Sequence, residues 1–221
     1  MMTVAGGSVS SGPAKAKTSG NTPFFQHEQQ TFVFFFTGFN STPGNDSGLD
    51  RLRGKLDDDS MPATLHVAPV NSYQLLSSVG QSFIRNWLAA NNSSSNDKVI
   101  LVGHSFGGNH ARILASDVDG HGKVAAGIAV IDPIDWLKIP TITQQFAFTY
   151  SLPAGMTQTN VRDYVQANDS LLTGYSIGAP AKNESSRKDA DGNPIKHGTI
   201  DDDDGIHQLI RLFILRIANT N

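Results

Sequence analysis

The chain has 221 residues, 38% of them hydrophobic and 17% charged, which is typical of one globular domain. Its net charge of −3 is small, so the sequence has neither the basic surface of a nucleic-acid-binding protein nor a polybasic membrane patch. The absence of cysteine excludes a disulfide framework and a thiolate site. No apolar run is long enough to predict an integral membrane segment.

The first residues of the chain differ in composition from the rest. Residues 1–24 are rich in Gly, Ser, Ala and Lys and offer little apolar surface for packing. We therefore expect a disordered tail over 1–24 and a single domain over 25–221. The segment lacks the charged start and apolar stretch of a secretory signal, which predicts a cytoplasmic location.

Apolar runs and helical patterns alternate along the predicted domain. The expected strands cover 31–39, 63–70, 98–103, 123–131 and 160–167. The expected helices cover 45–56, 72–90, 109–118 and 205–217. The first run, "TFVFFFTGF", is apolar at every position, as in a strand buried on both faces, whereas the fifth alternates and is expected nearer an edge. Strands alternating with helices predict an α/β fold with a mostly parallel sheet and helices on both faces.

The second expected helix shows how its apolar residues should face the core. Leu76, Val79, Phe83 and Trp87 recur at helical spacing within 72–90. We expect these four side chains to form one buried stripe.

A glycine-rich turn joins the third expected strand to the following helix. Residues 103–107, Gly-His-Ser-Phe-Gly, match the pattern G-x-S-x-G. The glycines permit a sharp turn that exposes the serine hydroxyl above the sheet, and the start of the helix favours developing negative charge there. In parallel sheets ligands bind at the carboxyl ends of the strands, which is where this turn lies. The motif predicts Ser105 as a nucleophile.

With this motif the sequence resembles the α/β-hydrolase superfamily, in particular its small serine lipases and esterases. The resemblance covers roughly residues 30–218 and rests on "GHSFGG", on "TGF" after the first strand, on "VIDP" and on a late histidine. It implies the α/β-hydrolase fold with a short cap insertion, expected over 136–155. It also implies a catalytic triad of serine, acid and histidine in that chain order, in which the histidine takes the serine proton and the acid orients the histidine.

The acid of the triad has three candidates. Asp132, in "VIDPID", ends the expected strand that follows the nucleophile helix, and the proline after it stops the strand at the rim of the sheet. Most α/β-hydrolases carry the acid one strand later, which would here be Asp169. We favour Asp132, with Asp169 and the neighbouring Asp135 as alternatives.

Two of the seven histidines follow the last expected strand, where the superfamily places its base. His197 lies on a loop that can reach the rim of the sheet, whereas His207 lies within the closing helix. We expect His197 to be the base, with His207 as the alternative. His104 should leave the turn in a different direction from the serine, and His110 should be a packing residue.

The resemblance also implies an oxyanion hole formed by two backbone N–H groups. We assign these to Phe106, directly after the serine, and to Phe39, after the first strand. Four consecutive acidic residues, 201–204, are expected to accompany the positive start of the closing helix rather than a calcium ion. The sequence has no Walker loop, dinucleotide fingerprint or zinc spacing, so we expect no cofactor and no metal.

Apolar and aromatic residues are frequent in the expected cap insertion, 136–155. They indicate a small-molecule ester with an apolar acyl group as substrate, although the same residues could simply complete the core. The predicted function is a serine hydrolase that cleaves carboxylic esters through an acyl-enzyme on Ser105. The alternatives are an acyl thioesterase, which uses the same chemistry, and a non-catalytic binding protein with the hydrolase fold.

Overall fold

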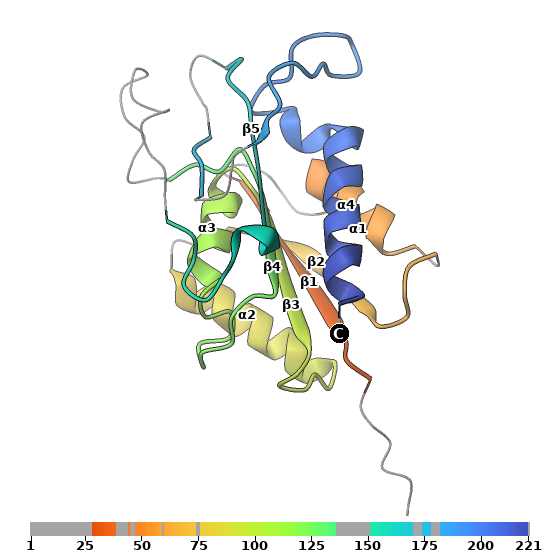
Figure 1. Ribbon diagram of the computed structural model, residues 1–221, viewed down its shortest axis with the longest axis vertical. Helices are drawn as coiled ribbons and strands as arrows, with labels where there is room; N and C mark the ends of the chain where they lie inside the picture. The colour runs from red at the N-terminus through yellow and green to blue at the C-terminus, as the bar shows by residue number, and fades with distance from the viewer. Residues whose placement is uncertain are drawn as a thin grey trace, which may run out of the picture.

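Figure 1 shows the computed structural model of the chain. The structure describes residues 28–38, 44, 47–58, 60–73, 76–135, 151–169, 174–177 and 182–220. The expected tail, 1–24, lies outside the described residues, as does most of the expected cap insertion.

The centre of the molecule is a six-stranded sheet in the order β2-β1-β3-β4-β5-β6, and every neighbouring pair is parallel. The strands are β1 (Thr31–Thr37), β2 (Leu65–Ser72), β3 (Lys98–His104), β4 (Gly127–Ile131), β5 (Val161–Val165) and β6 (Lys182–Asn183). This confirms the predicted parallel sheet and the position of the fifth strand next to an edge. The edge strand β6 was not predicted, because a strand of two residues has no detectable periodicity.

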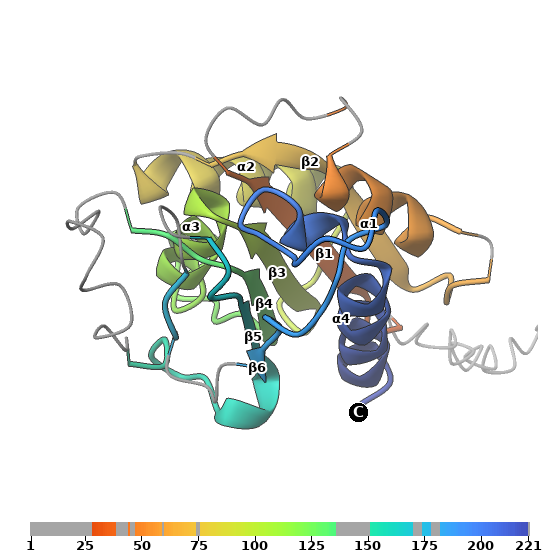
Figure 2. The same ribbon diagram turned by 90° about the horizontal axis from the view of Figure 1, so that it is seen from above.

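Helices cover both faces of this sheet, as predicted. They are α1 (Gly48–Leu56), α2 (Ser77–Ala90), α3 (Phe106–Leu114) and α4 (Asp204–Ala218). Figures 1 and 2 show α1 and α4 on one face and α2 and α3 on the other. Two short 3-10 helices, η3 (Gln158–Asn160) and η4 (Ile200–Asp202), precede β5 and α4. No helix in the described part of the chain is long and apolar enough to cross a membrane.

Strand β1 explains why its sequence is apolar throughout. Successive side chains of a strand point to opposite faces of the sheet. Phe32, Phe34 and Phe36 accordingly pack in the layer that contains α2 and α3, and Val33 and Phe35 in the layer that contains α1 and α4. All five are fully buried. An alternating polar and apolar pattern would have placed polar side chains in the core on one face of the sheet.

Helix α2 differs from its prediction in the residues that it buries. The core-facing side is formed by Gly80, Phe83, Ile84, Trp87 and Leu88. Leu76 and Val79 are exposed, with 66% and 46% of their surface accessible. Leu76 is the N-cap, outside the helical turns, and the buried stripe is centred on positions 80, 84 and 88. The predicted stripe was therefore correct only in its second half.

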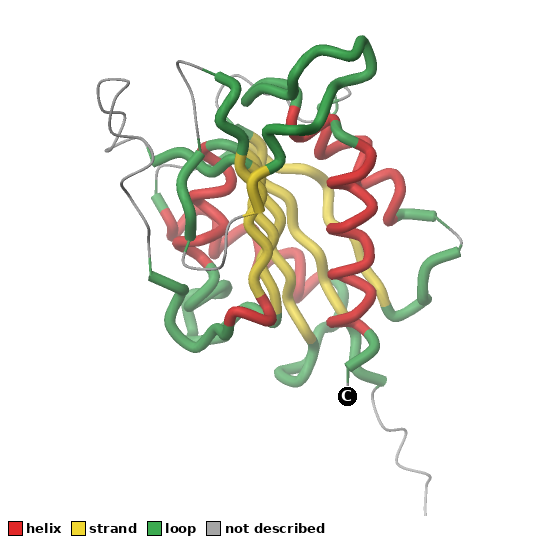
Figure 3. The backbone as a smooth tube through the Cα atoms, turned by 45° about the horizontal axis from the view of Figure 1, so that its top comes forward, coloured by secondary structure: helices red, strands yellow, loops and turns green. Residues whose placement is uncertain are grey.

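The carboxyl ends of the strands lie at the same edge of the sheet, because all pairs are parallel. Ser105 follows β3 there, Asp132 follows β4 and Gln166 follows β5. The long connection between β6 and α4, residues 184–203, crosses this edge (Figure 3). Side chains from distant parts of the chain are thereby brought together.

Candidate active site

Ser105 occupies a sharp turn between β3 and α3. Its backbone has φ 56° and ψ −127°, a conformation that costs free energy for any residue with a side chain. The Ser105 N–H donates to the carbonyl of Ile131 at 3.0 Å, and the Ser105 carbonyl accepts from the N–H of Ile134 at 3.0 Å. These two bonds attach the strained residue to both sides of Asp132.

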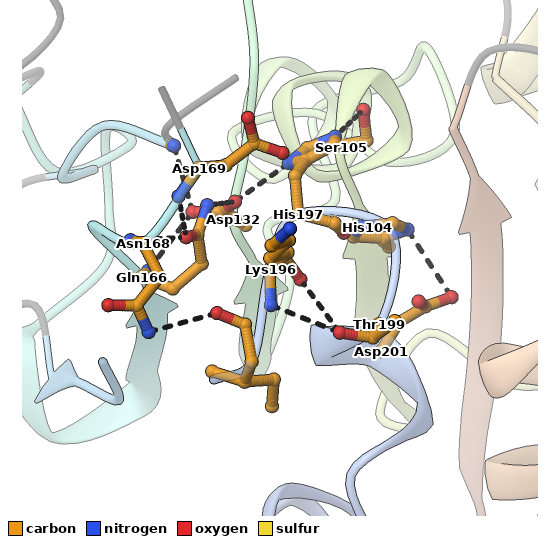
Figure 4. Close-up of polar contacts among 12 residues, drawn as sticks. His104, Ser105, Asp132, Gln166, Asn168, Asp169, Lys196, His197, Thr199 and Asp201 are labelled. Carbon is orange, nitrogen blue, oxygen red and sulfur yellow. Dashed lines mark hydrogen bonds and ion pairs between the residues drawn. The ribbon is translucent and has the colours of Figure 1, made fainter. Parts of the chain in front are cut away.

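His197 connects Ser105 to Asp132 through its two ring nitrogens (Figure 4). Its Nε2 lies 2.8 Å from Ser105 Oγ, and its Nδ1 lies 2.7 Å from Asp132 Oδ2. A carboxylate only accepts hydrogen bonds, so Nδ1 carries the ring hydrogen and Nε2 presents its lone pair to the serine hydroxyl. All three residues are buried. The arrangement allows His197 to remove the proton from Ser105.

Asp132 is held by donors from two further segments. Its Oδ1 accepts from the backbone N–H groups of Gln166 and Gly174, at 3.2 and 2.8 Å. Its Oδ2 accepts from Gln166 Nε2 at 2.8 Å in addition to His197. Four donors therefore fix a carboxyl group that is fully buried. The contribution of Gln166 was not predicted, because nothing in its local sequence distinguishes it from other glutamines.

Of the two residues predicted to form the oxyanion hole, the structure describes only Phe106. Phe106 is the first residue of α3, directly after Ser105, and its ring lies 5.4 Å from that of Tyr73. Phe39 lies outside the described residues. Gly38, the residue before it, is described, and a Cβ added there would lie 2.7 Å from Ser105 Cβ. The segment that leads into residue 39 therefore passes directly against the serine.

Comparisons with known proteins support the fold but are distant in sequence. No family model matches the chain. No curated protein matches it either. A solved structure of a putative YdeN-like hydrolase from Pectobacterium atrosepticum is 14% identical and has a TM-score of 0.52, covering 86% of this chain and 93% of its own. The chain has the α/β-hydrolase fold.

Two further solved structures are similar at lower scores. A gene product of Listeria innocua is 12% identical with a TM-score of 0.49, covering 85% of this chain and 94% of its own. An acetyl xylan esterase is 13% identical with a TM-score of 0.47, covering 87% of this chain and all of its own, 100%.

In this α/β-hydrolase fold, the carboxylate that accepts from His197 Nδ1 belongs to Asp132. The backbone N–H of Asp169 donates to Gln166 Oε1 at 2.9 Å, and Gln166 Nε2 donates to the Asp132 carboxylate at 2.8 Å. Asp135 is the residue after Ile134, whose backbone N–H donates to the Ser105 carbonyl at 3.0 Å. Both ring nitrogens of His197 are hydrogen-bonded to other groups. The structure thus brings the favoured acid, Asp132, together with the histidine.

The alternative base, His207, is fully buried in α4 and belongs to another hydrogen-bonded group. Its Nε2 lies 2.6 Å from the carbonyl oxygen of Asp201, and its Nδ1 lies 3.1 Å from Lys55 Nζ. Burial lowers the pKa of His207 below its usual value. The ring therefore anchors the start of α4 rather than reaching Ser105.

The four acidic residues 201–204 do not all have the same role. Asp203 is the N-cap of α4 and accepts from the N–H of Ile206 at 2.7 Å, and Asp204 lies in the first turn, as predicted for a helix start. Asp201 differs, because it is 7% exposed and its Oδ2 lies 3.3 Å from His104 Nδ1. This contact of Asp201 was not predicted from the sequence. Among the described residues, no group of three or more His, Cys, Asp or Glu could hold a metal ion.

Proposed function

We propose that this protein is a serine hydrolase that cleaves carboxylic esters through an acyl-enzyme on Ser105. The observation that carries the proposal is the hydrogen-bonded series Ser105–His197–Asp132, with 2.8 and 2.7 Å between the bonded atoms, at the carboxyl edge of the sheet. A serine hydroxyl is a weak nucleophile until a neighbouring base removes its proton. The fold likeness to a protein described as a putative hydrolase agrees with this proposal.

The first step is attack on the ester carbonyl carbon. His197 Nε2 takes the proton from Ser105 Oγ while the oxygen forms a bond to the carbonyl carbon. The imidazolium that results is stabilised by Asp132, whose carboxylate is already oriented by Gln166 and Gly174 and does not need to reorganise. The negative charge on the carbonyl oxygen is assigned to the N–H groups of Phe106 and Phe39.

The second step releases the alcohol and regenerates the enzyme. The tetrahedral intermediate collapses, the bond to the alcohol oxygen breaks, and that oxygen takes the proton from His197. Water then attacks the acyl-enzyme, again losing a proton to His197, and the carboxylic acid leaves as Ser105 recovers its hydrogen. The same residues serve both halves of the reaction.

The proposed substrate is a small-molecule ester with an apolar acyl group. Phe106 and Tyr73 place aromatic rings beside the serine turn. Apolar side chains of this kind bind an acyl chain by removing its surface from water.

Labelling with a fluorophosphonate tests the proposal, because this reagent bonds covalently to an activated serine. We expect the parent protein to be labelled and to hydrolyse a p-nitrophenyl acyl ester. Ser105→Ala should abolish labelling and reduce turnover by about 10⁴–10⁶-fold. Ser95→Ala, which removes an exposed loop hydroxyl, is the control and should leave both unchanged. An unlabelled parent protein, or a Ser105→Ala variant with activity within tenfold of the parent, would contradict the proposal.

A further inference from the structure

A second histidine–aspartate pair lies directly beside His197. His104, the last residue of β3, is buried, and its Nε2 lies 2.9 Å from the backbone oxygen of His197. Its Nδ1 faces Asp201 Oδ2 at 3.3 Å. The ring centroids of His104 and His197 are 5.0 Å apart (Figure 4). The pair thus contacts the backbone of the proposed base, while His104 is covalently bonded to Ser105.

The partners of His104 determine how many hydrogens its ring carries. A backbone carbonyl oxygen only accepts hydrogen bonds, so Nε2 must carry a hydrogen to bond to residue 197. A carboxylate also only accepts, so a hydrogen on Nδ1 is required to satisfy the contact with Asp201. A histidine with hydrogens on both nitrogens is a cation. The geometry therefore favours an imidazolium at position 104.

The surrounding charges agree with this protonation state. Burial by itself lowers the pKa of His104, but the carboxylates of Asp201 and Asp132 and the His197 carbonyl outweigh it and raise the pKa above its usual value. Burial likewise raises the pKa of Asp201, but the facing His104 lowers it overall. Asp202 is a further carboxylate within electrostatic reach of His104.

Asp201 is itself fixed from the opposite side. Its backbone oxygen accepts from His207 Nε2 at 2.6 Å, and His207 Nδ1 in turn accepts from Lys55 Nζ at 3.1 Å. A continuous series of contacts therefore runs from α1 and α4 through Asp201 and His104 to the backbone of His197.

We propose that His104 and Asp201 form a positioning pair, with His104 acting as an imidazolium that holds the backbone of His197 in register with Ser105. The inference rests on the proposed function, because it assigns His197 as the base. His104 does not touch the reacting atoms. Its effect is to keep Nε2 of His197 at hydrogen-bonding distance from the nucleophile, and a misplacement of about 1 Å in such a group can cost about 10²-fold in rate.

Three substitutions at position 104 separate the two contacts. The amide nitrogen of glutamine occupies the place of histidine Nε2, so His104→Gln keeps a donor to the His197 carbonyl and loses the one to Asp201. Asparagine places its amide nitrogen near Nδ1, so His104→Asn keeps the Asp201 contact only. His104→Ala removes both contacts. His121→Gln, on a loop whose histidine is exposed, is the matched control.

We expect kcat for a p-nitrophenyl ester to fall by about 10–100-fold in His104→Asn and His104→Ala, with KM changed by less than about threefold. His104→Gln should recover kcat to within about fivefold of the parent, and His121→Gln should match the parent. If His104 contributed only to stability, all three variants would have lower melting temperatures. Their kcat values would then not follow the expected order, with His104→Gln above His104→Asn and His104→Ala. Equal kcat in His104→Gln and His104→Asn, or a kcat of His104→Ala equal to that of the parent, would overturn the proposal.

A measurement independent of activity follows the His104 proton. In ¹⁵N NMR of the ring, His104 should carry both hydrogens up to a pH above the ordinary histidine midpoint of 6.5, and Asp201→Asn should lower that midpoint. A singly protonated ring at pH 6.5 in the parent would exclude the imidazolium. If the parent showed no Ser105-dependent fluorophosphonate labelling, the proposed function would fail, whereas the NMR result would still decide the state of the pair.

Discussion

Gly107 packs against Phe36 so closely that a Cβ added to the glycine would lie 2.0 Å from the Phe36 carbonyl oxygen. The first turn of α3 is thereby pressed against the end of β1, which keeps the serine turn beside the segment after the first strand. A side chain at position 107 would have to displace backbone, not a flexible side-chain end.

We therefore expect Gly107→Ala to destabilise the protein by about 1–3 kcal/mol or more and to reduce turnover. Gly54→Ala is the control, because Gly54 lies in α1 with nothing within 4 Å of an added Cβ, and alanine favours a helix by about 1 kcal/mol over glycine. Chemical denaturation of both variants measures the difference. Equal stability of the two variants would show that the contact with Phe36 is not tight.

Asp132→Asn should reduce turnover by about 10⁴-fold with little loss of structure. The amide would remove the negative charge that orients His197 and would permit the ring tautomer with its hydrogen on Nε2, which cannot accept the serine proton. Asp169→Asn should change turnover by less than about tenfold, because the His197 ring nitrogens bond to Ser105 and Asp132. Steady-state kinetics on both variants tests this, and the reverse order would assign the acid to the later strand.

The pH profile of kcat/KM should distinguish His197 from His207. An essential base produces a fall in kcat/KM on the acid side, where it is protonated. His197→Ala should abolish this limb along with most of the activity. His207→Ala should keep the limb and most of the turnover but lose about 1–3 kcal/mol of stability, because a fully buried ring with two partners is removed. A missing acid limb in His207→Ala would contradict the assignment.

Asp163 is buried on β5, and we expect its carboxyl group to make the free energy of unfolding fall as pH rises. Burial raises its pKa to about 7 from the ordinary 3.8, so the neutral acid favours the folded state. That contribution is fully present below 3.8 and is lost as pH rises through 7. Asparagine keeps an oxygen for the Ile177 N–H, which donates to Asp163 Oδ2 at 2.8 Å.

Relative to the parent, Asp163→Asn should therefore gain stability between pH 4 and pH 8, on the order of a few kcal/mol. Urea denaturation at several pH values measures this gain. Asp191→Asn, at an exposed turn, should show no such trend. A parallel pH dependence in parent and Asp163→Asn would show that the buried carboxyl is ionised in the folded state.

We expect His110 to give the free energy of unfolding a pH dependence of the opposite sign. The ring packs edge-on against Phe36, and burial lowers its pKa to about 4 from 6.5. Its neutral form favours folding, so this contribution is present above 6.5 and is lost as pH falls to about 4. His110→Leu should lack that acid-side loss, on the order of 2–3 kcal/mol, in thermal unfolding measured at pH 4 and pH 7. An unchanged acid-side loss in His110→Leu would show that another group causes it.

Several elements could be predicted from local sequence alone. The unbroken apolar run of β1, the alternating β5 and the apolar stripe of α4 each follow from the period of the structure that they form. The Gly103–Gly107 pattern is similarly local, because the turn that places Ser105 at φ 56° has no room for a side chain two residues before or after the serine. Helix α2 shows the limit of this approach. Its apolar residues extend beyond the side that faces the sheet, so periodicity could not say that Leu76 and Val79 stay exposed.

The sequence by itself determined the parallel α/β fold, the serine turn and a short set of candidate acids and histidines, because those features depend on residues close together in the chain. Only the tertiary structure decided which candidates meet. Asp132 and His197 are 65 residues apart, and the choice of Asp132 over Asp169 depends on which carboxylate the Gln166 and Gly174 donors surround. The contact of His104 with the His197 backbone was equally invisible, since it arises when the loop before α4 folds back over the end of β3. Hydrogen bonds between distant segments depend on distances in space, which a linear pattern of residue types does not contain.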